Sequence, residues 1–230
     1  MSEAAPGLPD SPGWATPERA RLAEAVRGLS DAVMTTAGDD AALLLDVADE
    51  TERLAARLGA RRDGGTGYQA QAHSDYLPRS PVVGEASPLA PRIAWDTTDD
   101  ALDGKPGIEA RGTFGAPYEG PPGHVHGGMI ALAFDEVLGI ANIAGNHPGM
   151  TARLTVHYRK PTPLYHELHF RAVVDRVEGR RIMSRAELWD GETLTAQAEG
   201  LFVRPRPERA VEIFGALAEG AFADEPPGPA

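Results

Sequence analysis

The sequence predicts an α+β fold in which an antiparallel sheet wraps around one long central helix, with a helical hairpin on its N-terminal side. Three patterns predict it. Apolar residues recur at helical spacing between residues 17 and 58. An almost uninterrupted apolar segment covers 127–144, which is typical of a helix buried on all sides. Residues 150–203 alternate between apolar and polar, as the strands of an antiparallel sheet do.

Two amphipathic repeats predict the N-terminal hairpin. Thr16 caps a helix just ahead of Pro17, and its apolar stripe continues to about residue 36. Asp39 or Asp40 caps a second helix that ends near Leu58, before the glycine-rich residues 59–67. The two stripes are Leu22, Val26, Leu29 and Val33, then Leu44, Val47, Leu54 and Leu58. We expect the hairpin to be an extra packing layer.

The remaining elements follow in chain order. Residues 68–92 hold many prolines and few periodic signals, so we expect an extended segment laid over a surface. From Ile93 the period changes to two. The expected strands are 93–96, 108–115, 150–159, 167–176, 180–189 and 193–203, and the tail from residue 205 holds one short helix. This divides the chain into a tail and hairpin (1–67), a sheet-and-helix domain (68–204) and a C-terminal tail (205–230).

Composition narrows the classes of protein and of site. The chain has 230 residues and no cysteine, which excludes disulfides, thiolate metal sites and cysteine nucleophiles. Its net charge of −12 argues against nucleic-acid binding. The first residues lack the basic and apolar regions of a signal peptide, and two acids in the middle of 127–144 argue against a membrane span. We therefore expect a cytoplasmic protein.

The acids inside the apolar helix raise the question of function. An ionised carboxylate in a buried segment needs a partner or a role, and Asp135 suits a general base or a nucleophile. Gly127 and Gly128 open the same helix, where unpaired N–H groups form a natural oxyanion hole. The two ends of this arrangement are about 12 Å apart along the axis, too far to touch one carbonyl. If both act, two helices must lie antiparallel, which predicts a homodimer with two sites at its interface.

Other polar residues have simpler interpretations. Glu136 faces a different side of the helix from Asp135, so we expect a structural partner. His124 and His126 form an H-x-H pair, but no third ligand follows at the usual spacing, so no metal is expected. We expect the ring of His126 to fix the turn before the helix. Two basic clusters remain as candidate anion sites: Arg153, His157, Arg159 and Lys160, and Arg176, Arg180, Arg181 and Arg185.

The segment "HVHGGMIALAFDE", followed by "MTARLTVHYRKPTPL", resembles the hotdog-fold acyl-CoA thioesterases of the PaaI and THEM4 type. The family pattern is His-Gly-Gly, an Asp nine residues after the His, and a strand that begins with Ser or Thr and ends in a basic-Pro turn. Its residues here are His126, Gly127, Gly128, Asp135, Thr151 and Arg159-Lys160-Pro161. The resemblance covers about residues 81–204 and leaves the helical hairpin outside.

The resemblance implies hydrolysis of an acyl-CoA thioester without a metal or redox cofactor, by a dimer or a dimer of dimers. The amide of Gly127 or Gly128 would polarise the carbonyl, Asp135 of the other subunit would activate water or attack directly, and Thr151 would position the water. The groups that would hold CoA phosphates are Arg159, Lys160 and Arg153. Several relatives have Asn or Gln six residues before the His, where it assists the carbonyl, whereas this chain has Gly120 after Glu119. Either that helper is dispensable, or Glu119 takes a different part in substrate binding.

Two other functions stay open at this point. The same pocket could hold acyl-CoA or a fatty-acyl group without turnover. A hotdog enoyl-CoA hydratase is the second alternative, but that chemistry pairs an Asp with a His a few residues away, and the next histidine after Asp135 is His147, beyond the helix end. The helical hairpin could also act as a lid over an acyl chain.

Overall fold

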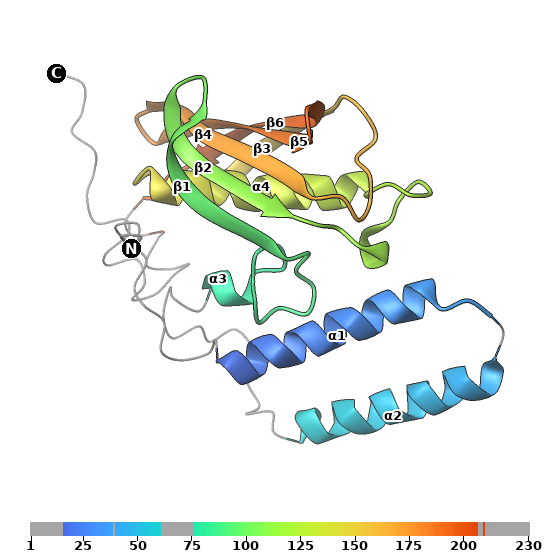
Figure 1. Ribbon diagram of the computed structural model, residues 1–230. Coiled ribbons are helices and arrows are strands. Elements are labelled where there is room, and N and C mark those ends of the chain that lie inside the picture. Colours follow the sequence, from blue (N-terminus) through green and yellow to red (C-terminus); the bar gives the residue numbers. More distant parts are fainter. Residues whose placement is uncertain (1–15, 39, 61–75, 207–208, 210–230) are drawn as a thin grey trace.

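The computed structural model describes residues 16–38, 40–60, 76–206 and 209, and Figure 1 shows their arrangement. Its helices are α1 (Pro17–Thr35), α2 (Ala41–Gly59), α3 (Tyr76–Arg79) and α4 (Gly127–Ala144), with a 3₁₀ turn η2 (Ala116–Tyr118). Its strands are β1 (Ile93–Leu102), β2 (Lys105–Gly112), β3 (Met150–Tyr158), β4 (Leu168–Glu178), β5 (Arg181–Asp190) and β6 (Thr193–Val203). The expected domain borders near residues 67 and 68 and the C-terminal tail lie mostly outside the described residues.

The six strands form one antiparallel sheet in the order β1-β2-β4-β5-β6-β3. The sheet curls around α4, which lies against its concave side (Figure 1). Because α4 connects β2 to β3, the chain crosses the sheet there, and β3 pairs with β6 at the far edge. The predicted α+β fold, an antiparallel sheet wrapped around a long helix, is therefore confirmed.

The core lies between α4 and the inward-facing side chains of the sheet. Phe134 of α4 meets Phe170 of β4 edge to face, with ring centroids 5.6 Å apart. Alternate residues of β4, β5 and β6 are buried, which is the period-two pattern of a sheet with one covered face. Asn142 of α4 is fully buried, and its side-chain oxygen accepts a hydrogen bond from the Ser184 hydroxyl at 2.5 Å. This polar contact ties the end of α4 to β5.

The expectation that α4 is buried on all sides is wrong for the single chain. A stripe along the helix is left uncovered at Leu132, Asp135, Gly139 and Ile143, where Leu132 is 38% and Ile143 37% exposed. These positions recur every three or four residues, so they share one face. The sheet covers only the opposite face. The helix is apolar and long enough to cross a membrane by length and composition, yet eight of its 18 residues are buried in the domain.

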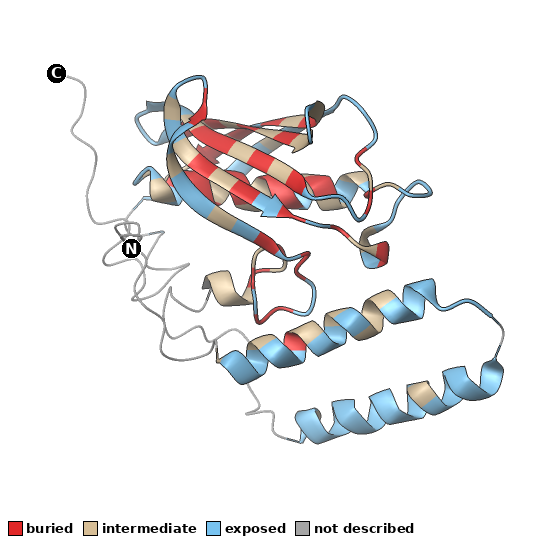
Figure 2. Cartoon of the chain, in the orientation of Figure 1, coloured by how far each residue is buried: buried red, intermediate tan, exposed pale blue. Residues whose placement is uncertain are grey.

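Helix α1 turns the side that carries Ala23, Arg27 and Asp31 toward the domain. Ala23 is its buried residue, whereas Leu22 is 45% and Val33 63% exposed. Figure 2 shows α2 almost entirely exposed, and none of its residues is buried. The apolar stripe of a helix faces the protein core only when no polar side chains on another face bind the core more strongly. Here hydrogen bonds from α1 to neighbouring loops decide its orientation, as the cleft described below shows.

The proline-rich residues before β1 form a series of turns instead of an extended segment, and Val82 and Ala90 are buried in them. Strand β1 is longer than the expected 93–96. Its polar second half is still paired with β2 because a two-residue turn at Asp103 (φ 55°) and Gly104 (φ 72°) closes the hairpin. Positive φ at both central positions matches the twist of paired strands.

Candidate active site

The carboxylate of Asp135 has a direct partner. It lies half-buried on the uncovered stripe of α4, and Thr151 at the start of β3 donates its hydroxyl to the Asp135 Oδ1 at 2.8 Å. The predicted spacing thus brings the two residues together, with Thr151 contacting the carboxylate itself. A carboxylate that accepts one hydroxyl hydrogen bond keeps lone pairs free for a second partner. Asp135 is therefore oriented and still able to accept a proton.

The first turn of α4 separates the roles of the two glycine amides. His126 is the N-cap, and its Nδ1 accepts the N–H of Gly128 at 3.0 Å. The N–H of Gly127 has no hydrogen-bond acceptor among the described residues. The helix end carries a positive partial charge. Of the two amides, Gly127 therefore has the donor that a substrate oxygen could reach, while Gly128 is engaged by the cap.

Tyr158 is a residue of this site that the sequence reasoning missed. It lies at the end of β3 and donates its hydroxyl to the carbonyl oxygen of Gly127 at 2.7 Å. Strand β3 therefore makes two side-chain hydrogen bonds to α4, from Thr151 to Asp135 and from Tyr158 to Gly127. In the sequence, Tyr158 continues the apolar alternation of the strand, and no sequence signal distinguishes a tyrosine that packs from one that holds a helix terminus.

The loop before α4 is held by backbone contacts. The His126 N–H donates to the Tyr118 carbonyl at 2.8 Å, and the Val125 N–H donates to the Thr162 carbonyl at 2.8 Å. The carboxylate of Glu119, proposed from the sequence for substrate binding, accepts the Gly123 N–H at 2.6 Å. Glu119 therefore closes its own turn, and this contact competes with any role toward a ligand.

Gly120 is required by the close approach of this loop to the helix cap. A Cβ at position 120 would lie 2.7 Å from the Cα of His126. The Asn or Gln found at this place in several relatives cannot fit here without moving the cap. Glycine replaces the Asn or Gln of the family pattern because the loop passes too close to His126 for any side chain at position 120.

The substitution Gly120→Ala tests this steric requirement. We expect it to destabilise the protein by about 1–3 kcal/mol, because the backbone must shift to relieve the contact. Urea unfolding followed by circular dichroism measures the effect. Gly59→Ala is the matched control, because a Cβ at position 59 meets nothing within 4 Å. Equal stability of the two variants would contradict the role assigned to Gly120.

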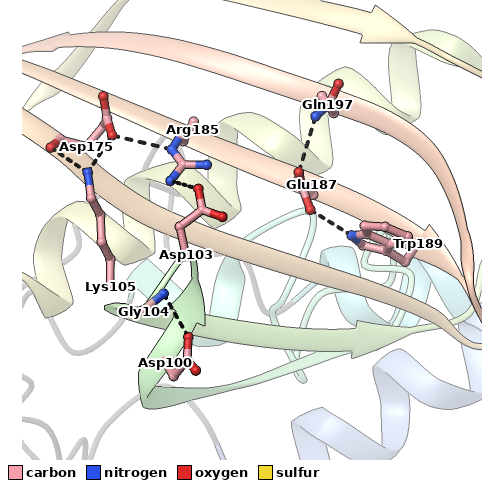
Figure 3. Close-up of polar contacts among 9 residues, drawn as sticks. All are labelled: Asp100, Asp103, Gly104, Lys105, Asp175, Arg185, Glu187, Trp189 and Gln197. Atoms are coloured by element: carbon pink, nitrogen blue, oxygen red, sulfur yellow. Dashed lines mark hydrogen bonds and ion pairs between the residues drawn. The ribbon is translucent and has the colours of Figure 1, made fainter.

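The candidate basic groups differ in their availability. Arg153 and Lys160 are exposed, and Arg159 donates through its Nε to the Gln197 side chain at 3.0 Å. In the second cluster, Arg185 is paired with Asp103 at 2.6 Å and with Asp175, which also binds Lys105 (Figure 3). The chain's own acids therefore neutralise Arg185. The first cluster, which runs along β3 and the two residues after it, is the better candidate for a phosphate.

Both histidines of the H-x-H pair contact backbone atoms through their rings. His124 Nδ1 lies 2.8 Å from the Pro122 carbonyl oxygen, and His126 Nδ1 accepts the Gly128 amide. Within the described ranges, no three His, Asp or Glu side chains are grouped as metal ligands.

Comparison with known proteins places this geometry in a family. Residues 122–197 match the model of the thioesterase superfamily. The crystal structure of a thioesterase superfamily protein is 31% identical and superposes with a TM-score of 0.71, over 85% of this chain and 94% of that one. The chain belongs to the thioesterase superfamily. The hotdog fold is thereby shown together with the family.

Curated relatives of this thioesterase-superfamily chain carry a more specific name. The acyl-coenzyme A thioesterase THEM4 of Xenopus laevis is 36% identical over 94 residues, and that of Bos taurus is 33% identical over 99 residues. These matches cover 40% and 42% of this chain, and 42% and 40% of the relatives. The chain thus spans about two fifths of the length of the curated relatives it matches. Their activity is a guide for a proposal and not a property already assigned.

Proposed function

We propose that this protein hydrolyses an acyl-CoA thioester to the free acid and CoA. The observation that carries the proposal is the Thr151–Asp135 hydrogen bond at 2.8 Å on the uncovered face of a helix whose Gly127 amide is unengaged within the described chain. An oriented carboxylate and a free amide donor at a helix N-terminus are the two groups that acyl transfer to water requires. The names of the curated relatives support the same activity.

The proposed reaction uses one group from each of two subunits. The Gly127 N–H of one copy binds the thioester oxygen, and Asp135 of the other accepts a proton from the attacking water. Negative charge then develops on the carbonyl oxygen, where the amide and the helix dipole stabilise it. Collapse of the tetrahedral species breaks the C–S bond, and the proton held by Asp135 passes to the CoA sulfur. Direct attack by Asp135, through an acyl-enzyme anhydride, is the alternative route to the same products.

The geometry of α4 supports a homodimer in this mechanism. Gly127 and Asp135 of one helix are about 12 Å apart, so they cannot both reach one carbonyl. A two-fold axis near Leu132 would set the Gly127 end of one helix beside Asp135 of the next. The uncovered stripe of α4 and the free edge of β3 are the surfaces that such a dimer would cover. We propose a dimer or a dimer of dimers, in the cytoplasm.

The roles of other residues are proposals on the same basis. Thr151 orients Asp135 and through it the water, while His126 caps the helix and keeps its first turn in place. Arg159 and Lys160 just after β3, and Arg153 within it, provide positive charge for the phosphates of CoA. The chemistry requires neither a metal nor a redox cofactor.

A panel of acyl-CoA esters tests the function. We expect release of free CoA thiol from at least one of butyryl-, octanoyl-, palmitoyl- and phenylacetyl-CoA, measured with a thiol reagent. If the protein binds these esters but releases no thiol from any of them, the non-catalytic binding function replaces the hydrolase. Water addition to crotonyl-CoA, followed by loss of enoyl absorbance, would instead indicate the hydratase.

A further inference from the structure

A cleft of about 600 Å³ lies between α1 and the sheet-and-helix domain. Its walls are mostly apolar and come from α1 (Gly28), the turns before β1 (Pro88, Leu89, Pro91), η2 (Pro117, Tyr118) and α4 (Met129, Leu132). Sites for small organic ligands have volumes of about 300–1,000 Å³ and mainly apolar linings. The cleft therefore has the size and chemistry to take an apolar group.

The polar face of α1 builds one side of this cleft. Arg27 donates to the Ser87 carbonyl at 2.5 Å and to Glu24 at 2.9 and 3.1 Å, while Arg92 donates to Glu24 at 2.8 Å. The Arg92 hydrogen bond holds the pKa of Glu24 below its usual range, and Arg27 adds to this effect. Asp31 accepts the Ala116 N–H at 3.3 Å. Charged groups thus hold α1 against the loops, and Glu24, Arg27, Asp31 and Arg92 also line the cleft beside its apolar residues.

Tyr118 connects the cleft to the start of α4. Its carbonyl oxygen accepts the His126 N–H at 2.8 Å, and its hydroxyl donates to the Leu89 carbonyl in the cleft wall at 3.0 Å. Burial raises the pKa of the Tyr118 hydroxyl, so it remains a donor at neutral pH. Met129 and Leu132, which also line the cleft, follow Gly128 within two turns of the same helix. The cleft lining on α4 therefore begins two residues after Gly127, whose amide is proposed for the thioester oxygen.

We propose that this cleft receives the apolar tail of the acyl group and that α1 sets the acyl length the enzyme accepts. The proposal rests on the proposed thioester hydrolysis and names a subsite for its substrate. Because α1 lies outside residues 122–197, which match the family model, this wall is contributed by the part of the chain beyond the matched segment. A thioester carbonyl at Gly127 leaves the tail next to Met129 and Leu132, where burial in the cleft removes it from water.

Gly28→Phe tests the proposal by narrowing the cleft. A Cβ at Gly28 meets nothing within 4 Å, so a larger side chain can enter the space without displacing the backbone. We expect kcat/KM for palmitoyl-CoA to fall about tenfold or more relative to butyryl-CoA, because single methylene differences in an apolar pocket already change selectivity by about tenfold or more. The loss should lie mainly in KM.

Gly59→Phe is the matched control, because position 59 is also open and lies on α2, outside the cleft. An unchanged ratio of palmitoyl-CoA to butyryl-CoA in Gly28→Phe, or the same change in Gly59→Phe, would overturn the proposal. Calorimetric binding of palmitoyl-CoA separates this outcome from failure of the proposed function. If the wild type binds it without turnover and Gly28→Phe binds it tenfold more weakly, the hydrolase fails and the cleft stands. Equal affinity of the two proteins, or no binding by the wild type, would overturn the cleft.

Discussion

The substitution Asp135→Asn is expected to lower kcat for acyl-CoA hydrolysis by about a hundredfold to ten-thousandfold. The amide keeps the size of the side chain and can still accept the Thr151 hydroxyl, so the fold and the position of the side chain should persist. It cannot accept a proton from water or attack the carbonyl. Turnover of the best ester of the panel, with circular dichroism as a check of folding, measures the effect.

Two neighbouring substitutions make the Asp135 test specific. Thr151→Val removes the hydroxyl that orients the carboxylate, and we expect a smaller loss than in Asp135→Asn. Glu136→Gln alters the adjacent acid on another side of α4 and should leave turnover within about threefold of the wild type, as the effect of a group outside the site. Unchanged turnover in Asp135→Asn, with a large loss in Glu136→Gln, would move the base to Glu136.

The second large effect concerns Leu132→Arg, which we expect to give a monomer that no longer hydrolyses acyl-CoA. Leu132 is 38% exposed near the midpoint between Gly127 and Asp135. A two-fold axis there would set the new guanidinium against its own copy, and an unpaired buried charge costs several kcal/mol. Separation of the subunits leaves each Asp135 without the opposing Gly127 amide. Light scattering after size exclusion gives the mass, which decides the test. The thiol assay uses butyryl-CoA, because Leu132 also lines the cleft proposed for longer acyl tails.

Val177→Arg provides the control for added charge. Val177 is 37% exposed on β4, outside the stripe of α4, so this variant should keep both the oligomeric state and the activity of the wild type. A Leu132→Arg protein that remains dimeric would place the two-fold axis elsewhere. A monomeric wild type with full turnover would rule out a site shared between subunits.

Most of the correct predictions concern the bounds of single helices and strands, which depend on residues close together in the chain. The apolar run of α4 has the exact bounds expected, 127–144, because a glycine pair opens it and Gly145 follows it. The strands β3 and β6 follow from alternation with little error at their ends. The bounds of β1 were underestimated because its second half is polar, and an edge strand can be polar on both faces as long as its backbone is paired.

Contacts between residues far apart could not be predicted in the same way. Tyr158 is an ordinary strand residue until β3 packs beside the first turn of α4. The spacing of Asp135 and Thr151 suggested a shared site, but not that the hydroxyl donates to the carboxylate. For α1, the apolar stripe did not show which face would meet the domain, because the partners of Arg27 and Asp31 lie 60 and 85 residues away.

The amino-acid order alone determined the fold class, the extent of α4 and the presence of an acid and a glycine-rich start in that one helix. These follow from side-chain periodicity and backbone freedom, which are local properties. Only the tertiary structure decided which amide stays unengaged, which helix faces remain uncovered and where a cleft opens beside α4. Each of these depends on hydrogen bonds and packing between distant segments, and such contacts produce no periodic pattern in the sequence.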